Sequence, residues 1–278
     1  MSEGIQLEDE MRIIGSYADG KLLAGRIDNI GILLFNQPQK RNAINLEMWD
    51  GIAEALDLLE ADREVRVVVH AGAGGKAFTS GNDISQFAAR RNDADANVEF
   101  KRITGRGRNR MASFAKPSVA CIQGFCLGGG LATALLADLR VAAADAMFGV
   151  PAARLGIAFG LDPMELLVQL VGPSRARLML YTARRFTALE AQAMGLVDCV
   201  VEAQDAVRET LALARSIAEN APLSVLAARF AIGQVMKAPH ERDIAAMDAF
   251  TRRCMNSADY REGRAAFAEK RKPQFTGE

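Results

Sequence analysis

The 278-residue sequence contains few of the groups that usually carry covalent or metal chemistry in proteins. It has two histidines and four cysteines, and the cysteines form neither a CxxC pair nor another spacing typical of metal ligands. No Ser–His–Asp or Cys–His arrangement is supported by spacing. The sequence therefore predicts no metal site, and its cysteines indicate reduced thiols in a cytoplasmic protein.

Net charge is also absent, because 34 basic side chains balance 34 acidic ones. A neutral chain has no electrostatic footprint for nucleic acid or an anionic membrane. The acidic start MSEGIQLEDEMR is unlike a secretory signal. Residues 117–137 carry no charge and are long enough to cross a bilayer, but Gly124 and the triplet Gly128–Gly130 interrupt them. We therefore expect a buried strand followed by a buried helix, and no membrane partner.

Half of the residues are apolar, and their spacing predicts alternating strands and helices over most of the chain. The expected elements include two strands joined at 28–29, helices over 46–61 and 93–114, and buried strands over 65–70 and 118–124. From Gln204 onward the sequence is rich in helix-forming residues. It predicts an α/β core over residues 1–203 and a helical C-terminal region over residues 204–278.

Two glycine-rich segments each follow a buried strand: HAGAGGKAFTSGNDI and QGFCLGGGLA. Glycine lets a ligand approach backbone N–H groups closely, and the first N–H groups of a helix lack partners within it. Two such groups from separate loops can converge on one oxygen as an oxyanion hole. Tight packing of a helix on a strand is the alternative interpretation of the triplet. The GxGxxG fingerprint of dinucleotide-binding proteins does not follow any predicted strand.

Five segments occur along the chain in an order and spacing typical of one family: QPQKRNAI, AGGKAFTSGNDI, KPSVACIQGFCLGGGLATALLADLRVAAADAMFGVP, TALEAQAMGLVDCVV and YREGRAAFAEKRKPQF. Together they resemble the enoyl-CoA hydratase/isomerase (crotonase) family over about residues 21–275. The resemblance implies a crotonase-like α/β spiral of ββα units followed by a C-terminal helical trimerisation region. It also implies a homotrimer or a hexamer built from two trimers.

The resemblance further implies an acyl-CoA thioester as substrate, so that coenzyme A is part of the substrate and no separate cofactor is expected. By motif position, the backbone N–H groups of Asn82 and Gly129 would hold the thioester oxygen. Ile84, in the same motif as Asn82, is a further predicted acyl-CoA contact. Asn82 stands where alanine is more usual in the family, and a turn or packing role is the alternative for its side chain.

Four basic residues are predicted by position to bind the phosphates of coenzyme A. They are Lys40, Arg41, Lys270 and Lys272. For each of them a solvated surface charge is the alternative interpretation.

The chain departs from the family pattern where hydratases carry their two catalytic glutamates. Those glutamates orient and activate a water molecule and protonate the α-carbon. The corresponding positions here are Ala132 and Ala152. Alanine can neither accept a proton nor orient a water molecule, so the ordinary hydratase mechanism lacks both of its acid–base groups.

Asp162 is the best candidate for a substitute acid, since some family members place an acid in this downstream loop. Its alternative role is helix capping, because Asp162, Pro163 and Glu165 fit an N-cap, a first helical proline and a capping-box partner. His70 and His240 are weaker candidates, with a satisfied core residue and a surface residue as their respective alternatives.

The sequence leaves several functions open within this family. An enoyl-CoA hydratase/isomerase-type enzyme fits the loops, although hydration itself lacks its glutamates. Decarboxylation of a β-carboxylated acyl-CoA fits, because loss of CO2 generates the enolate, and isomerisation fits if Asp162 or His70 carries the proton. A non-catalytic acyl-CoA-binding or assembly protein is the remaining alternative.

Overall fold

The computed structural model describes residues 7–83 and 94–278, with side chains in the second range described from residue 102 onward. The strands are β1 Arg12–Tyr17, β2 Leu22–Ile27, β3 Ile30–Phe35, β4 Val67–Gly72, β5 Ala77–Thr79, β6 Ser118–Ile122, β7 Phe125–Leu127, β8 Leu139–Ala143, β9 Met147–Gly149, β10 Phe186–Thr187 and β11 Cys199–Val201. The helices are α1 Leu7–Glu10, α2 Leu46–Ala61, α4 Ala94–Ala112, α5 Gly129–Ala134, α6 Leu161–Thr182, α7 Ala188–Ala193, α8 Ala206–Ala218, α9 Pro222–Val235, α10 Ile244–Asn256 and α11 Ala258–Glu269.

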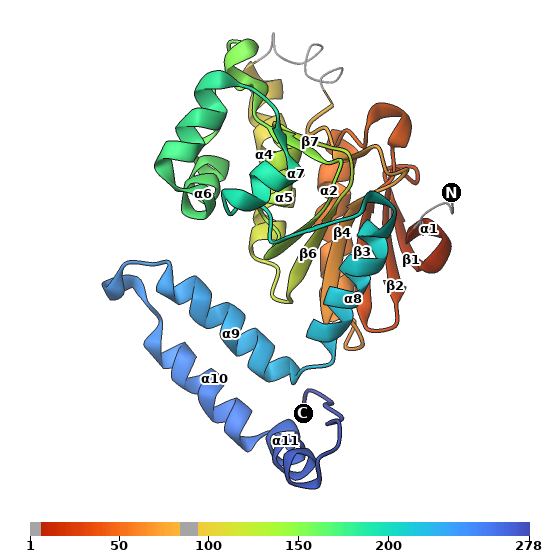
Figure 1. Ribbon diagram of the computed structural model, residues 1–278, viewed down its shortest axis with the longest axis vertical. Coiled ribbons are helices and arrows are strands. Elements are labelled where there is room, and N and C mark those ends of the chain that lie inside the picture. Colours follow the sequence, from red (N-terminus) through yellow and green to blue (C-terminus); the bar gives the residue numbers. More distant parts are fainter. Residues whose placement is uncertain (1–6, 84–93) are drawn as a thin grey trace.

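The strands form two mixed sheets (Figure 1). The larger sheet has the order β1-β2-β3-β4-β6-β8-β11, and the smaller one has the order β10-β9-β7-β5. Strands β4, β6 and β8 are parallel neighbours in the larger sheet, while β5, β7 and β9 are parallel neighbours in the smaller one. The chain thus repeats a unit of one strand in each sheet followed by a helix: β4-β5-α4, β6-β7-α5 and β8-β9-α6. This is the expected spiral of ββα units.

Local sequence signals account well for the first elements of the fold. Strands β2 and β3 pair antiparallel around a turn at Asp28, whose φ of 50° is left-handed, as predicted for residues 28–29. Helix α2 has the predicted bounds, and the Asn45 side chain caps it by accepting a hydrogen bond from the Met48 N–H at 2.8 Å.

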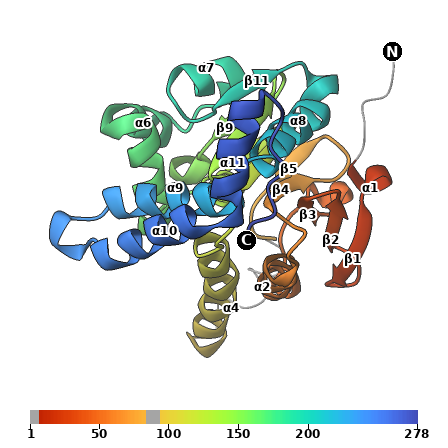
Figure 2. The same cartoon turned by 90° about the horizontal axis from the view of Figure 1, so that it is seen from below.

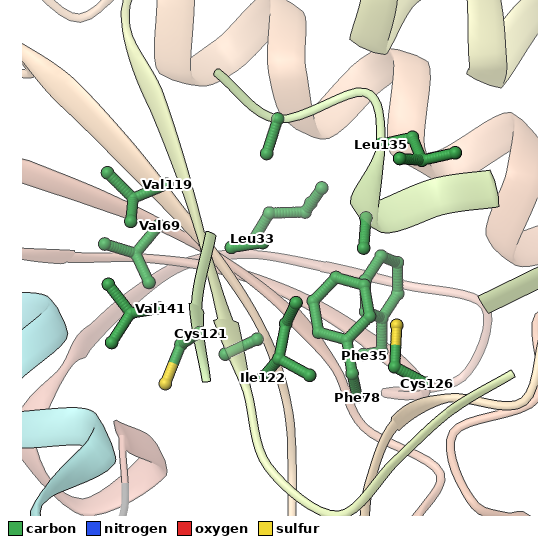
Figure 3. Close-up of a cluster of buried hydrophobic side chains, with 14 of the residues drawn as sticks. Leu33, Phe35, Val69, Phe78, Val119, Cys121, Ile122, Cys126, Leu135 and Val141 are labelled. Atoms are coloured by element: carbon green, nitrogen blue, oxygen red, sulfur yellow. The ribbon is translucent and has the colours of Figure 1, made fainter. Parts of the chain in front are cut away.

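A hydrophobic core lies on both faces of the larger sheet, between the two sheets on one side and toward α8 on the other (Figure 3). Phe35 of β3 meets Phe78 of β5 edge-on, with ring centroids 5.6 Å apart. Cys126 of β7 is buried in the same cluster, and all four cysteines are free thiols. The strands of the larger sheet are apolar on both sides because helix α8 packs against β4 and β6 on the opposite face.

The C-terminal helices extend away from the sheets (Figures 1 and 2). Helix α8 lies against the larger sheet, whereas α9 and α10 pack against each other and reach past it. Pro222 begins α9, because proline fits the first turn of a helix, where its missing N–H would have no helical partner. No helix in the described part of the chain is long and apolar enough to span a membrane. A division of the chain between residues 203 and 204 stays a prediction.

Candidate active site

The two glycine-rich loops predicted from the sequence lie backbone against backbone. A Cβ atom on Gly130 would collide with the carbonyl oxygen of Thr79, and one on Gly81 would lie 2.7 Å from the Cα of Gly129. Only glycine permits so close an approach, and Gly81 also has a left-handed φ of 83°. Close packing, one interpretation of the triplet, is therefore a real function of Gly130.

The same approach brings two backbone N–H groups together. A Cβ atom on Gly129 would lie 3.4 Å from the backbone nitrogen of Asn82. Around Asn82 the chain bridges to Ile44, which donates to the Gly81 carbonyl at 2.7 Å and accepts from the Asp83 N–H at 2.9 Å. Because N–H groups alternate along an extended chain, the Asn82 N–H faces away from this bridge. Gly129 is the first residue of α5, so its N–H has no partner within that helix.

Both glycine loops open on a cavity of about 900 Å³. Its lining includes Asn82 and Gly129, together with residues of α4, α5, the loop before α6 and α6 itself. Among its lining residues are Asn82, Arg108, Gly129, Ala132, Leu136 and Asp162. The arrangement can hold one oxygen atom between two rigid donors at the base of a mixed polar and apolar chamber.

A hydrogen bond and a cation–π contact support Asn82 from the side of α2 and α4. The Trp49 indole Nε1–H donates to the Asn82 side-chain oxygen at 2.7 Å. The Arg108 guanidinium carbon lies 5.1 Å from the centroid of the Trp49 ring. Helix α4 comes this close because residue 107 is glycine: a Cβ there would lie 2.5 Å from the Trp49 carbonyl oxygen. The Asn82 side chain thus has a packing role, one of the two alternatives expected for it.

The capping role considered for Asp162 is wrong. Helix α6 begins at Leu161, with Gly160 as its N-cap in an extended conformation, and no side chain caps it. The helix starts earlier than the Asp-Pro sequence suggested because proline fits anywhere in the first turn, where N–H groups lack helical partners. Glu165 is not a capping-box partner either, since it accepts a hydrogen bond from Gln169 at 3.3 Å. Asp162 lines the cavity without a hydrogen bond to any described residue.

The two alanines at the expected glutamate positions differ in placement. Ala132 is in α5 and lines the cavity beside Gly129. Ala152 lies buried in the short 3-10 turn Pro151–Arg154, and it is not part of the cavity wall. No carboxylate replaces either of them at its own position.

The four cations expected at coenzyme A lie in two separate places. Lys40 donates to Asp83 at 2.9 Å, and the Arg41 guanidinium carbon lies 5.2 Å from the Phe125 ring, so both are close to the glycine loops. Lys272 pairs with Glu219 at 2.8 Å beside a different cavity, and Lys270 ends α11. Within one chain, Lys270 and Lys272 do not reach the cavity that contains Asn82. Ile84 lies outside the described residues.

His70 does not approach the cavity. It lies in the middle of β4, between Leu33 of β3 and Ala120 of β6, and is buried. Neither of its ring nitrogens has a hydrogen-bond partner, so the expected satisfied core residue is unsatisfied. Burial lowers its pKa to about 4, against a weaker opposing effect of Asp138. Within the described residues no cluster of three or more potential metal ligands occurs.

Comparison with known proteins agrees with this geometry. The family model described as enoyl-CoA hydratase/isomerase matches residues 26–278. This chain belongs to the enoyl-CoA hydratase/isomerase family.

Family members of known sequence and structure resemble the chain over nearly its whole length. It is 33% identical to the crotonyl-CoA hydratase of Syntrophomonas wolfei over 89% of this chain and 95% of that protein. It is 34% identical to the human mitochondrial enoyl-CoA hydratase domain-containing protein 2, over 95% and 91% of the two chains. The structure of an enoyl-CoA hydratase/carnithine racemase from Magnetospirillum magneticum superposes with a TM-score of 0.89 at 33% identity, covering 96% and 99%.

Sequence reasoning identified neither Arg108, which lines the cavity, nor Trp49, which lies buried behind it against Asn82 and Arg108. In the sequence, Arg108 is one of several basic residues in KRITGRGRNR, and Trp49 is one of the apolar positions of the predicted helix over 46–61. The available signal was the pair Gly105 and Gly107, because a glycine inside a helical pattern can mark a close packing contact, although only Gly107 makes one. It did not reveal which helix approaches, since α2 and α4 are far apart in sequence.

Proposed function

We propose that this protein binds an acyl-CoA thioester with the carbonyl oxygen between the N–H groups of Asn82 and Gly129, and that Asp162 carries a proton to or from the enolate formed there. The observation that carries this proposal is the opening of two adjacent, unused backbone donors onto a cavity that also contains an unbonded carboxylate. Backbone donors suit this task because they are already fixed before charge develops on the oxygen. Each is worth about 3 kcal/mol at the transition state.

Arg41 is the best-placed candidate to bind the phosphates of coenzyme A. It lies next to the loop that contains Asn82, and its charge has no acidic partner within 4 Å among the described residues. Lys40 is close by, but its ammonium group already pairs with Asp83. Lys270, Lys272 and Ile84 stay predicted contacts.

The reaction that fits these groups best is an isomerisation. Asp162 as base removes a proton from the substrate carbon skeleton, the oxyanion hole holds the resulting dienolate, and the same carboxyl group returns the proton at another carbon. The double bond moves and no atom is gained or lost. Addition of water by the two-glutamate route is not expected, because Ala132 and Ala152 cannot activate water.

Decarboxylation is a second candidate, favoured by the apolar wall next to the donors. Ala132 and Leu136 face the cavity beside Gly129. An apolar surface destabilises a carboxylate, whereas loss of CO2 from a β-carboxylated acyl-CoA leaves its electron pair as an enolate that the two N–H groups can hold. This reaction needs an acid only to protonate the enolate afterwards.

A panel of CoA thioesters tests the proposed isomerisation. Purified protein is incubated with 2-enoyl, 3-enoyl, hydroxyacyl and β-carboxyacyl thioesters, and each product is followed by mass spectrometry and chromatography. Turnover of the 3-enoyl substrate is expected to fall about 10²- to 10⁴-fold in Asp162→Asn, as for loss of a general acid–base group. Asp145→Asn, which changes an exposed carboxylate in the turn before β9, is the matched control and is expected to turn over normally.

Three results would contradict the proposal. Hydration of crotonyl-CoA at rates typical of hydratases would show that the missing glutamates are not needed. CO2 release that survives Asp162→Asn would favour the decarboxylase. Tight thioester binding without turnover of any substrate would leave a non-catalytic acyl-CoA-binding protein.

A homotrimer or hexamer, a cytoplasmic location and the lack of a nucleic-acid partner complete the proposed description. The oligomeric state follows from the resemblance to the family. The last two follow from the cysteines and the balanced charge of the chain.

A further inference from the structure

Arg108 is a cation of the cavity wall that the proposed chemistry does not use. It lies on α4, lines the cavity that contains Asn82 and Gly129, and covers the Trp49 ring at 5.1 Å. Trp49 itself is almost fully buried. The guanidinium thus lies against an aromatic ring, which accepts none of its N–H groups in a hydrogen bond.

No group in the described part of the chain uses those donors. The Arg108 guanidinium makes no hydrogen bond there, and no carboxylate lies within 4 Å of it. Asp162, across the cavity, acts on it only at longer range, while burial lowers the pKa of Arg108. A partly buried cation with five free donors is costly to maintain without an anionic partner.

The neighbouring arginines of α4 behave differently. Arg106 pairs with Asp50, and Arg110 donates to Asp57 at 2.6 Å and to Glu60 at 2.5 Å. These ion pairs connect α4 to acidic residues of α2. Arg108 alone of the three lines the cavity, which indicates a ligand contact instead of a structural ion pair.

We infer that the cavity takes acyl-CoA thioesters whose acyl chain ends in a carboxylate, and that Arg108 binds this carboxylate. The inference rests on the proposed function, since it assumes that the thioester lies between Asn82 and Gly129. Arg108 and Asn82 contact different parts of Trp49: Arg108 lies over the ring, and Asn82 accepts from the Nε1–H at the ring edge. With the thioester carbonyl at Asn82, Arg108 is left for the far end of the acyl group. The planar guanidinium matches a carboxylate with two parallel hydrogen bonds.

The remaining wall suits the methylene groups between the two ends of such a substrate. Side chains that contribute apolar surface to the cavity are Ala112, Ala132, Leu136, Phe159 and Leu166. An acyl chain with an apolar middle and an anionic end therefore finds matching surface along its length.

Binding of two saturated thioesters of equal carbon number tests the inference. Glutaryl-CoA carries a carboxylate where pentanoyl-CoA carries a methyl group, and neither contains a double bond to react. Trp49 is the single tryptophan of the chain and contacts both Asn82 and Arg108, so its fluorescence reports on this site; calorimetry provides a second readout. Wild-type protein is expected to bind glutaryl-CoA about 10- to 100-fold more tightly than pentanoyl-CoA, as for a hydrogen-bonded charge pair.

Substitution of Arg108 is expected to remove this preference. Arg108→Met keeps the length and apolar stem of the side chain, and should weaken glutaryl-CoA binding about 10- to 100-fold while pentanoyl-CoA binding changes less than about 3-fold. Arg106→Met is the matched control on the same helix and is expected to bind both thioesters as wild type does. Circular dichroism checks that each variant is folded.

The outcomes separate this inference from the proposed function. Binding of both thioesters with equal affinity by wild-type protein overturns the role of Arg108 and leaves the oxyanion-hole proposal intact. The wild-type comparison decides this even if Arg108→Met fails to fold. Failure of wild-type protein to bind either thioester overturns the proposed function, and the inference with it. A preference for glutaryl-CoA that persists in Arg108→Met assigns the carboxylate to another residue.

Discussion

The backbone and the side chain of Asn82 are both held in place by neighbouring groups. Its neighbours in the chain hold it on Ile44, its side-chain oxygen accepts the Trp49 N–H, and its own N–H faces the cavity. An alanine at this position would keep the N–H but would leave the buried Trp49 donor without a partner. The asparagine is therefore explained by the support it gives to its own backbone donor.

Among the described residues, His70 is the one whose buried polar atoms have no hydrogen-bond partner. Both ring nitrogens are buried in the centre of β4 without partners. Such a side chain stays neutral, and each unpaired polar atom costs about 1–3 kcal/mol of stability. The proposed mechanism gives His70 no role that would compensate for this loss of stability.

We predict that His70 makes the protein acid-sensitive. Its pKa is about 4 in the folded protein and 6.5 ordinarily, so between these values the unfolded chain binds a proton that the folded one does not. Ionisation of His70 therefore does not affect the free energy of unfolding above pH 6.5. As the pH falls from 6.5 to about 4, preferential protonation of the unfolded chain lowers that free energy by about 3 kcal/mol. His70→Leu should be more stable at neutral pH and should lose less stability on acidification.

Urea unfolding at a fixed protein concentration and at several pH values measures this difference. His240→Gln, which removes the exposed histidine of the chain, is the control and should follow the wild-type profile. A parallel loss of stability in wild type and His70→Leu between pH 6.5 and 4 would show that His70 finds a partner in solution.

At the scale of elements, the contact between α2 and α4 connects packing to the site. Gly107 lets the backbone of α4 approach the Trp49 backbone, and this approach places Arg108 over the Trp49 ring. Gly105, one half-turn earlier in α4, has open space around it. The same helix thus contains one glycine that is required and one that is not.

We predict opposite effects for the same substitution at these two positions. Gly105→Ala should stabilise the protein by about 0.5–1 kcal/mol, because alanine favours helix and nothing obstructs its methyl group. Gly107→Ala should destabilise it by about 1–3 kcal/mol, because the methyl group would press on the Trp49 carbonyl and force α4 away.

Denaturant midpoints of the two variants measure the stabilities, and Trp49 fluorescence reports the local displacement. Only Gly107→Ala should change the emission of the folded protein. Equal stability of the two variants would mean that α4 shifts along α2 without cost.

At the scale of the whole molecule, the C-terminal helices expose large apolar side chains that a single chain leaves in contact with water. They include Ile232, Val235, Met236, Ile244, Met255 and Phe267. Ile232 and Val235 of α9 and Met236, its C-cap residue, fall on one face at spacings of three and four. Exposed apolar patches of this kind mark interaction surfaces.

We predict that the chain self-associates through these helices, as a trimer or a pair of trimers. Analytical ultracentrifugation should give a mass near three or six times 30.0 kDa. Ile232→Glu combined with Val235→Glu should lower this mass, because charged carboxylates would be buried at the contact. Ile13→Glu, at an exposed apolar position of edge strand β1, is the control and should leave it unchanged. A monomeric wild-type protein would contradict the prediction.

Much of this protein follows from its sequence, because the signals are local. Apolar periodicity and capping residues gave α2 its bounds, and the apolar runs predicted the buried strands β4 and β6. The order of motifs was sufficient to identify the family. The sequence alone shows that positions 132 and 152 are alanine and not glutamate.

Tertiary structure decided what depends on contacts between distant segments. It placed Gly129 beside Asn82, removed the capping interpretation of Asp162, and brought Arg108 onto Trp49 across 59 positions of sequence. Sequence patterns report which residues lie on one face of one element, whereas the partner across a contact depends on how the sheets and helices fold together. The two glycine-rich loops illustrate this difference. Their glycines predict a close approach of backbone, but only the fold shows that the two loops approach each other beside one cavity.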